Sequence, residues 1–456
     1  MDSQGKHFDM MSNTPVSKLI IRLSIPTIIS MMATTIYNMV DTAFVGKLGN
    51  SASGAVGIVF GFMSILQAIG FMFGQGSGSL LSRALGARDK EEASVVASTG
   101  FFASFGLGIA AAVICAIFVD PLVMFLGSTE TIAPYAKTYI YYILATAPLV
   151  VTSFTLNNIL RYEGKALLGM IGLISGGVLN IIGDAIFMFG FDMGIAGAGL
   201  STAISQVISF CILISMFVAG KTECRISIKR VSFKNLRLLN IITTGFPSLI
   251  RQSLGSIGTI LLNYEAAYYA GDAAVAAMSI VSRVSFFLFA IALGIGQGFQ
   301  PVCGFSYGAK KFKRLREAYR FTTIMATSVL FVLTVLALCV SSNIVKVFRD
   351  DAQVIEIGTR ALRLVAVAQV FLPICMVTEM MMQSSGWKKA ATLLSSLRGG
   401  LVFIPALLVL SYFRGLSGIQ EAQPLSYILT VPPAILYARK FFRSIPKDNA
   451  SSESTS

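Results

Sequence analysis

Residues 49–87, GNSASGAVGIVFGFMSILQAIGFMFGQGSGSLLSRALGA, recur in altered form as residues 271–309, GDAAVAAMSIVSRVSFFLFAIALGIGQGFQPVCGFSYGA. At an offset of 222 without gaps, 13 of these 39 positions are identical. The identities include Gly74-Gln75-Gly76 over Gly296-Gln297-Gly298, Gly86-Ala87 over Gly308-Ala309 and, farther on, Gly164 over Gly386. The chain therefore contains an internal repeat, and both copies are strongly apolar.

The composition predicts a polytopic membrane protein. Of the 456 residues, 55% are hydrophobic and 13% are charged, and the mean hydropathy is +0.74. A soluble protein carries about 25% charged residues. Segments that cross lipid must be helices here, because lipid offers backbone groups no other partner. The expected fold class is thus an all-α polytopic membrane protein.

Twelve apolar spans are each close to the ~20 residues that a bilayer requires. They are predicted at 19–44, 54–81, 94–119, 133–158, 167–190, 195–219, 240–269, 274–305, 320–343, 355–383, 389–413 and 417–438.

The polar segment 220–239 separates six spans from six. Because six is even, both halves enter the membrane with the same orientation, so the repeat is parallel and typical of a secondary transporter whose substrate path lies between the halves. We expect two pseudo-symmetric six-helix lobes. The predicted parts are a cytoplasmic N-terminal tail (1–18), an N-lobe (19–219), a cytoplasmic linker (220–239), a C-lobe (240–440) and a disordered cytoplasmic tail (441–456).

The net charge of +14 is unevenly distributed. Cations concentrate after spans 2, 4, 6, 8, 10 and 12, whereas the opposite loops carry few. This positive-inside pattern predicts cytoplasmic termini, and it directs the basic charge toward anionic lipid head groups rather than nucleic acid. The first 18 residues lack an apolar h-region, so no cleaved signal peptide is expected.

Each Gly-Gln-Gly segment lies near the middle of a span, at Gly74-Gln75-Gly76 and Gly296-Gln297-Gly298. Two glycines around a glutamine indicate a bend whose freed backbone groups the glutamine side chain can satisfy. Close helix packing through small residues accounts for most other glycines.

Acids inside a membrane are functional by default, because each costs about 2.5–3.5 kcal/mol to insert. Asp184 lies in span 5, with Asn180 four residues earlier on the same helix face. Thr202 in span 6 and Tyr139 in span 4 lie at similar depth, within about 10 Å. Asp41 lies near the outer end of span 1, where it is either a buried functional acid or one exposed to water.

Asp41 and Asp184 can share a proton, and with an amide oxygen and a hydroxyl they also offer an all-oxygen set for a hard cation such as Na⁺. The alternative is a purely structural role, in which the polar cluster only holds the helices of the lobe together. The lone histidine, His7, is in the N-terminal tail, so carboxylates must carry any proton through the membrane.

Other membrane charges remain ambiguous. Glu265 near the end of span 7 is expected to be a solvated helix-end acid. Whether Glu379 in span 10 faces a pore is left open by the sequence. Arg251 lies in span 7, and Arg283 in span 8 either pairs with Glu265 or faces a cavity. The flexible side chains of Met31 and Met63 suit a cavity for varied ligands.

No chemistry-bearing enzyme motif is present. The sequence has no G-x4-G-K-[ST], nucleophile elbow, HExxH or aspartate-rich diphosphate motif. The six cysteines show no metal spacing and are read as small buried hydrophobes. We therefore expect a transporter rather than an enzyme, with no cofactor and no structural metal.

The chain resembles the multidrug and toxic compound extrusion (MATE) transporters of bacterial type over about residues 15–443. The resemblance rests on a combination of short motifs. These are Pro26 with DTAFVGKLG in span 1, GQG with the later GA in both halves, RYEGK after span 4, Asn180-x-x-x-Asp184, and the following GIAGAG.

The resemblance implies a V-shaped pair of lobes and efflux of organic cations driven by H⁺ or Na⁺. In one branch of the family, the N-lobe cation site corresponds to Asp41, Asn180 and Asp184 here, with Thr202, Tyr139 and Asn157 in the same network. Another branch has a glutamate about nine residues after the span 7 proline. This chain has Ser256 after Pro247 and no acid there, which argues for coupling in the first lobe.

The expected function is a cation-coupled (H⁺ or Na⁺) antiporter that exports drugs and amphipathic, often cationic compounds across the bacterial cytoplasmic membrane, as a monomer. A lipid-linked oligosaccharide flippase of the same superfamily is the alternative, kept open by Arg251 and Arg283, and an intramembrane enzyme is a third reading. Substrate-cavity residues are expected to be Met31, Thr35, Met63, Asn157 and Arg283.

Overall fold

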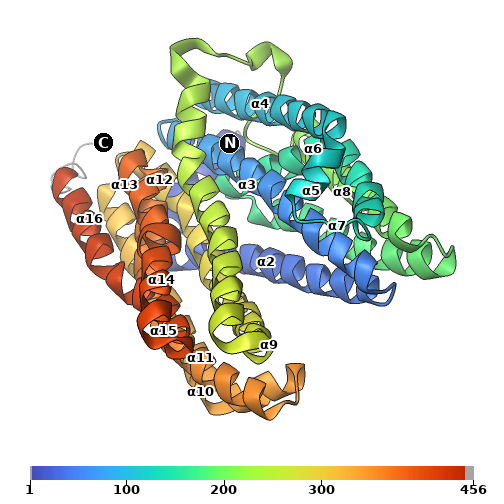
Figure 1. Cartoon of the computed structure of the whole chain (residues 1–456). Helices are drawn as coiled ribbons and strands as arrows, with labels where there is room; N and C mark the ends of the chain where they lie inside the picture. Colours follow the sequence, from blue (N-terminus) through green and yellow to red (C-terminus); the bar gives the residue numbers. More distant parts are fainter. Residues whose placement is uncertain (1–2, 447–456) are drawn as a thin grey trace, which may run out of the picture. The chain divides into compact units, whose positions relative to one another are not determined.

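The computed structural model describes residues 3–446, and within them apolar sequence forms long helices joined by short polar turns, with no strand (Figure 1). The α-helices are α1 (Ser3–Asn13), α2 (Val16–Gly46), α3 (Asn50–Gly86), α4 (Lys90–Ile117), α5 (Val119–Phe125), α6 (Ala133–Tyr162), α7 (Ala166–Asp184), α8 (Gly194–Val218), α9 (Arg237–Gly308), α10 (Phe312–Phe348), α11 (Ala352–Gln369), α12 (Leu372–Ser384), α13 (Lys388–Ser396), α14 (Phe403–Arg414), α15 (Leu416–Leu429) and α16 (Val431–Ser444). Two π-helical segments, η1 (Ala185–Gly190) and η4 (Leu397–Leu401), and two 3₁₀ turns, η2 (Ile228–Arg230) and η3 (Lys234–Leu236), complete the set.

The described helices match most, but not all, of the predicted spans. Within residues 3–446, nine helices are long and apolar enough to cross a membrane, or ten if α11 and α12, bent by 47°, form one span. The long helix α9 contains two predicted spans, because Gly271 breaks its helical geometry with φ 68°. The twelfth predicted span, 417–438, falls on α15 and α16, which are each shorter than a bilayer requires.

The chain divides into two compact units, and the division does not fall at the polar linker. One unit holds residues 29–249, and the other holds residues 1–28 together with 250–456. Each unit thus includes the first part of a helix whose remainder belongs to the other unit. Pro26 in α2 and Pro247 in α9 lie just before the two crossing points.

The unit of residues 29–249 is built around α6, which packs against α3, α4 and α8. Its core combines apolar side chains from these helices, including Phe62, Leu66, Ile143 and Phe154. The short helix α5 turns the chain between α4 and α6 (Figure 1).

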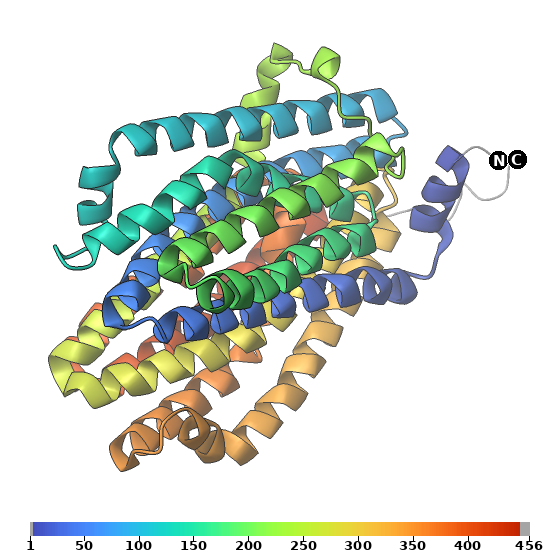
Figure 2. The same ribbon diagram turned by 90° about the vertical axis from the view of Figure 1, so that its right-hand side faces the viewer.

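In the other unit, every residue of α12 from Leu372 to Ser384 is buried except Ile374, which is partly exposed. Helix α12 packs against α10, α13 and α16, and α11 packs against α10 and α15. The separate short helix α1 lies next to the start of α2 (Figure 2).

The Gly-Gln-Gly segments lie at close helix contacts and not at breaks in the helices. Helix α3 runs through Gly76 without a non-helical residue, and α9 is interrupted only at Gly271. A Cβ atom on Gly76 would lie 2.1 Å from the carbonyl oxygen of Ile241, and one on Gly298 would lie 2.3 Å from Ser24 Oγ. In each unit, the Gly-Gln-Gly motif therefore packs closely against the first part of a helix that continues into the other unit. This helix is α9 for Gly76 and α2 for Gly298.

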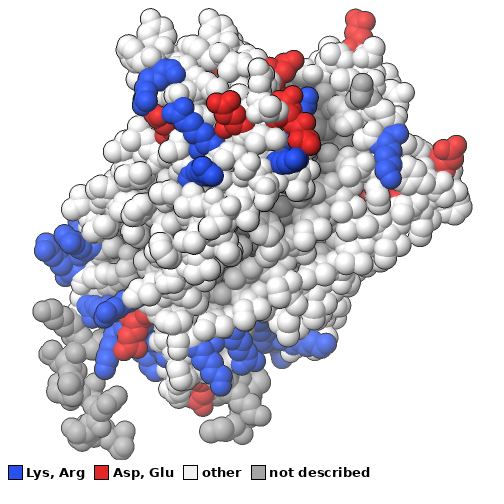
Figure 3. All heavy atoms as spheres, turned by 90° about the horizontal axis from the view of Figure 1, so that it is seen from below, with Lys and Arg blue, Asp and Glu red and all other residues white. Residues whose placement is uncertain are grey.

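The exterior is that of a membrane protein. Large apolar side chains are exposed along several helices, for example Val113, Ile260 and Phe331. On the face shown in Figure 3, charged side chains gather in groups and leave broad uncharged surface between them. Such extended apolar surface is expected where lipid is the solvent.

Candidate functional site

A buried polar cluster lies between α7 and α8. Asp184 is the last residue of α7 and is fully buried, as is nearly all of Asn180 one turn earlier. The Asn180 Nδ2 group is 3.3 Å from Asp184 Oδ1, 3.3 Å from Ser201 Oγ and 3.2 Å from Thr202 Oγ1, and it donates to these oxygens. Ser201 in turn donates to the Asn180 carbonyl oxygen at 2.9 Å. One asparagine therefore connects the acid to both hydroxyls.

Helix α6 contributes Tyr139 to the same cluster. Its phenolic oxygen is 3.4 Å from Thr202 Oγ1, and both side chains are buried. Four residues selected from the sequence by depth alone thus meet at one place within residues 29–249.

The Asp41 side chain of α2 completes the cluster. It lies within side-chain hydrogen-bonding range of Asp184. Asp41 Oδ1 and Asp184 Oδ2 are both buried and have no hydrogen-bond partner among the described residues. None of the ion pairs found in residues 3–446 includes either carboxyl group. Buried carboxyl oxygens without a protein partner are suited to a proton or a hard cation.

Glycines on α7 let neighbouring helices approach this cluster. A Cβ atom on Gly183 would lie 2.5 Å from Ser201 Oγ, and one on Gly177 would lie 2.9 Å from Cδ1 of Tyr37. The absence of side chains there brings α8 and α2 against the α7 face that carries Asn180.

The backbone changes type at the acid. Helix α7 ends at Asp184, and residues Ala185–Gly190 continue as a π-helical turn. Single π turns within helices are frequent at functional sites.

Three members of the site were missed in the sequence. Ser201 adjoins Thr202, Tyr37 lies one turn before Asp41, and Gly183 adjoins Asp184. Tyr37 lies close enough to Asp41 to interact electrostatically with its carboxyl group. Spacing of four residues was the available signal for Tyr37, whereas nothing in the sequence distinguishes Gly183 from the other glycines of this span.

Two of the predicted cavity residues lie elsewhere. Asn157 lies beside Gly169, whose Cβ atom would be 2.7 Å from Asn157 Nδ2. That point is about 22 Å along α7 from Asp184 at 1.5 Å per residue, so Asn157 is outside the cluster. Met63 is 8% exposed and belongs to the hydrophobic core.

The other three have partly open positions. Met31 is half-buried and packs against the same core, and Thr35 donates to the Met31 carbonyl oxygen at 2.9 Å. Arg283 is exposed on α9.

A second buried polar cluster lies in the unit that contains residues 250–456. Arg251 Nη1 is 2.5 Å from Glu379 Oε1, and the two side chains are 3% and 2% exposed. Ser395 Oγ donates to the same carboxylate oxygen at 2.6 Å. The buried Glu379 carboxylate is thus neutralised by the guanidinium group of Arg251.

Glu265 corrects a prediction. A solvated helix-end acid was expected, but Glu265 is 9% exposed and accepts a hydrogen bond from Ser411 Oγ at 2.6 Å. Arg283 makes no ion pair with it within residues 3–446.

The Asp41–Asp184 cluster does not resemble a transition-metal centre. No group of three or more His, Cys, Asp or Glu side chains that could hold a metal occurs among the described residues. The cluster's carboxyl and hydroxyl oxygens are the ligands of hard cations and not of soft transition metals.

The class of protein follows from comparison with known families. A family model described as MatE matches residues 26–186 and 247–408, one stretch in each half of the chain. These stretches cover well over half of the sequence, and the chain belongs to the MATE family. Membership confirms the sequence resemblance and makes the chain a multi-span membrane transporter rather than an enzyme.

Individual relatives cover nearly the whole chain. The Multidrug export protein MepA of Staphylococcus aureus (strain MSSA476) is 28% identical over 420 residues, which are 92% of each protein. A structure described as the outward-facing conformation of a multidrug resistance MATE family transporter of the MOP superfamily has a TM-score of 0.91 at 26% identity, covering 96% of this chain and 98% of that one.

A further similar structure comes from an archaeal transporter. A MOP superfamily transporter from Pyrococcus furiosus has a TM-score of 0.91 at 27% identity, covering 97% of this chain and 99% of that one, and its description states that reverse polarity of its binding pocket suggests a different function. These similarities confirm the all-α, two-lobe fold class.

Proposed function

We propose that this chain is a cation-coupled antiporter that exports drugs and amphipathic, often cationic organic compounds, with H⁺ or Na⁺ as the coupling ion. The observation that carries the proposal is the pair of facing carboxyls, Asp41 and Asp184, with two buried oxygens that no described group satisfies. Similarity to a protein named for multidrug export supports the substrate class.

Coupling acts through α2. The carboxyl of Asp41 lies in the part of this helix that belongs to residues 29–249, while residues 16–28 of the same helix belong to the other unit. A cation that binds between Asp41 and Asp184 removes their repulsion and repositions α2, so the site affects a helix shared by both units. Movement of one charge down the membrane potential supplies about 2.3 kcal/mol per 100 mV, which biases export when coupling is tight.

Asn180, Thr202 and Tyr139 act as positioning residues. The Asn180 amide holds one Asp184 oxygen and both hydroxyls in place, and Tyr139 anchors Thr202. With these contacts fixed, the acid can exchange its cation without rearrangement of α7 and α8.

The test is ethidium efflux from loaded proteoliposomes under an imposed H⁺ gradient or an imposed Na⁺ gradient. We compare the wild type with Asp41→Asn and Asp184→Asn. Asp192→Asn is the matched control, because Asp192 is an exposed acid just beyond η1. Efflux should follow one gradient, disappear in the two site variants and persist in the control.

Wild-type efflux from well-folded Asp41→Asn and Asp184→Asn variants would falsify the coupling site. Binding of ethidium to the purified variants, measured by fluorescence anisotropy, separates loss of coupling from loss of substrate binding.

We further propose a location in the cytoplasmic membrane, cytoplasmic termini and a monomer. The distribution of cations supports the orientation.

The flippase alternative loses one of its two supports. Arg251 is neutralised by Glu379 and is buried, so of these two arginines Arg283 is the one exposed to an anionic lipid-linked substrate. Accumulation of a lipid-linked precursor in a deletion strain, with ethidium efflux unchanged, would favour the flippase over the antiporter.

A further inference from the structure

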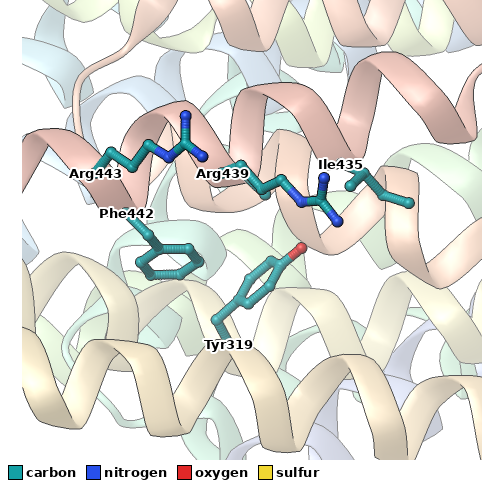
Figure 4. Close-up of a pocket in the computed structure, with 6 residues that line it drawn as sticks. Tyr319, Ile435, Arg439, Phe442 and Arg443 are labelled. Atoms are coloured by element: carbon teal, nitrogen blue, oxygen red, sulfur yellow. The ribbon is translucent and has the colours of Figure 1, made fainter.

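Helices α10 and α16 enclose an open groove of about 410 Å³. Figure 4 shows its residues, which combine apolar side chains with two guanidinium groups. The lining residues are Tyr319, Ile435, Ala438, Arg439, Phe442 and Arg443.

The floor of the groove is apolar and well ordered by contacts. The Tyr319 and Phe442 rings pack edge to face with centroids 5.2 Å apart. The Tyr319 hydroxyl lies 2.9 Å from Thr378 Oγ1, which fixes the ring against α12. Ile435 is 37% exposed and extends the apolar surface along α16.

The rim is cationic. Arg439 and Arg443 are four residues apart on α16, so their side chains share one face, and both are exposed. Figure 4 shows the Arg439 guanidinium near the Tyr319 hydroxyl. Neither arginine forms an ion pair within the described part of the chain. Two guanidinium groups and a phenol are donors suited to a phosphate.

The end of α16 is tied to α10 independently of these two arginines. Arg316 Nη2 donates to the carbonyl oxygens of Phe442, Ile445 and Pro446, at 3.5, 3.4 and 3.1 Å. The groove is therefore held open between anchored helices, and its arginines are free to bind a ligand.

The groove lies at the border of the apolar layer. Helix α10 has 37 residues, which is about 55 Å, whereas the hydrocarbon core is about 30 Å thick. The apolar span predicted within α10 begins at residue 320, so the first turns of the helix precede it, and Tyr319 lies about 10 Å from the start of the helix. Basic residues between Lys310 and Arg320 crowd the same end.

We propose that this groove binds an anionic phospholipid. The phosphate lies between Arg439 and Arg443, and an acyl chain follows Ile435 and the Phe442 ring. A free phosphate ion shares the head-group chemistry, but it makes no use of the apolar floor. Basic pockets between membrane helices are typical sites for acidic lipid head groups.

The experiment is native mass spectrometry of the full-length protein in detergent, titrated with phosphatidylglycerol or phosphatidylcholine. The wild type should bind phosphatidylglycerol roughly thirtyfold more tightly than phosphatidylcholine, because each of the two arginines contributes about 1 kcal/mol near a lipid surface. Arg439→Gln/Arg443→Gln should lose that preference. Ala438→Leu, which fills the groove and keeps both arginines, should weaken binding of phosphatidylglycerol as well.

The matched control is Lys229→Gln/Lys234→Gln, which removes the same charge at two exposed positions of the linker. It should retain the preference. Unchanged phosphatidylglycerol binding in the arginine pair variant overturns the proposal, as does equal loss in the control, which would indicate a diffuse charge effect. Millimolar inorganic phosphate should not displace the lipid; if it does, the groove is a phosphate site and not a lipid site.

Discussion

The buried carboxyl groups of the two units have different charge partners. Glu379 has the Arg251 guanidinium at 2.5 Å and the Ser395 hydroxyl at 2.6 Å. Asp184 has the Asn180 amide and a facing carboxyl, but no cationic side chain. The first acid carries its counterion within the chain, whereas the second requires one from outside. This difference supports the proposed coupling site and agrees with the absence of an acid at Ser256.

The Arg251–Glu379 pair makes a double-mutant prediction. Arg251→Gln and Glu379→Gln should each destabilise the protein by about 3–5 kcal/mol, because each leaves an uncompensated buried charge. Arg251→Met/Glu379→Leu should recover most of that loss. Thermal unfolding in detergent, followed by intrinsic fluorescence, measures the effect, and Arg283→Gln is the exposed control on the same helix. Additive losses in the double variant would contradict the paired assignment.

Residue positions were predictable where one helix sufficed to define them. The four-residue spacing of Asn180 and Asp184 follows from helix geometry, and the depth of Tyr139 and Thr202 follows from counting residues. Glu265 was misjudged because its partner, Ser411, lies on a helix 146 residues away. Depth along one span does not reveal which side chains of a distant span face it.

At the level of elements, the repeat extends to the turns. Arg88 and Lys310, 222 positions apart, both have positive φ, at 63° and 57°. Gly164 and Gly386 form a second matched pair, with φ of 78° and 86°. In each of these turns the chain leaves a helix through a left-handed residue, which satisfies the last carbonyl groups. The 222-residue offset thus describes backbone geometry as well as sequence.

Close contacts at the repeated glycines predict a strong effect of small substitutions. Gly76→Ala and Gly298→Ala should destabilise the protein by about 1–3 kcal/mol, because the added methyl group overpacks a helix contact. Gly61→Ala in α3 is the matched control, since no atom lies within 4 Å of its Cβ position. It should be neutral or stabilising, as alanine favours helix. Thermal unfolding of the three variants measures this difference, and similar values for all three would contradict the packing role.

The linker is fastened to its unit through Glu163 of the RYEGK segment. The fully buried carboxylate accepts hydrogen bonds from the backbone amides of Glu223 and Cys224, at 3.0 and 2.9 Å. Lys90 and Lys165 bind Glu223 at 3.1 and 3.0 Å. The linker, which was predicted only as a connection between the lobes, is therefore held against its unit by these contacts.

This arrangement predicts a specific pH dependence. Burial raises the pKa of the Glu163 carboxyl above its usual value, which is about 4.3 in an unfolded chain. A raised folded-state pKa gives stability that is present at low pH and is lost as pH rises through that pKa. The melting temperature of the wild type, relative to Glu163→Gln, should therefore fall as the pH rises above the unfolded-state pKa of about 4.3. A difference that grows with pH would show that the amide contacts outweigh burial.

At the scale of the whole molecule, orientation is open to direct measurement. In a cysteine-free background, Lys47→Cys and Lys229→Cys place exposed thiols in loops predicted on opposite sides of the membrane. A membrane-impermeant maleimide should label Lys47→Cys in intact cells and should label Lys229→Cys only after permeabilisation. The reverse pattern would place the termini outside.

The architecture was largely predictable, because hydropathy and the repeat define spans and halves. The division into units was not. Hydropathy locates the polar linker at 220–239, but the compact units exchange the first parts of α2 and α9. Packing contacts such as those of Gly76 with Ile241 decide that exchange, and no local pattern encodes them.

The exchanged segments impose an order of assembly during synthesis. Residues 3–28 leave the ribosome before residue 250, yet the unit to which they belong is otherwise formed by residues from 250 onward. The unit that contains residues 29–219 is likewise complete only after residues 237–249 have been synthesised. Neither half, expressed as a separate fragment, contains all of its own unit.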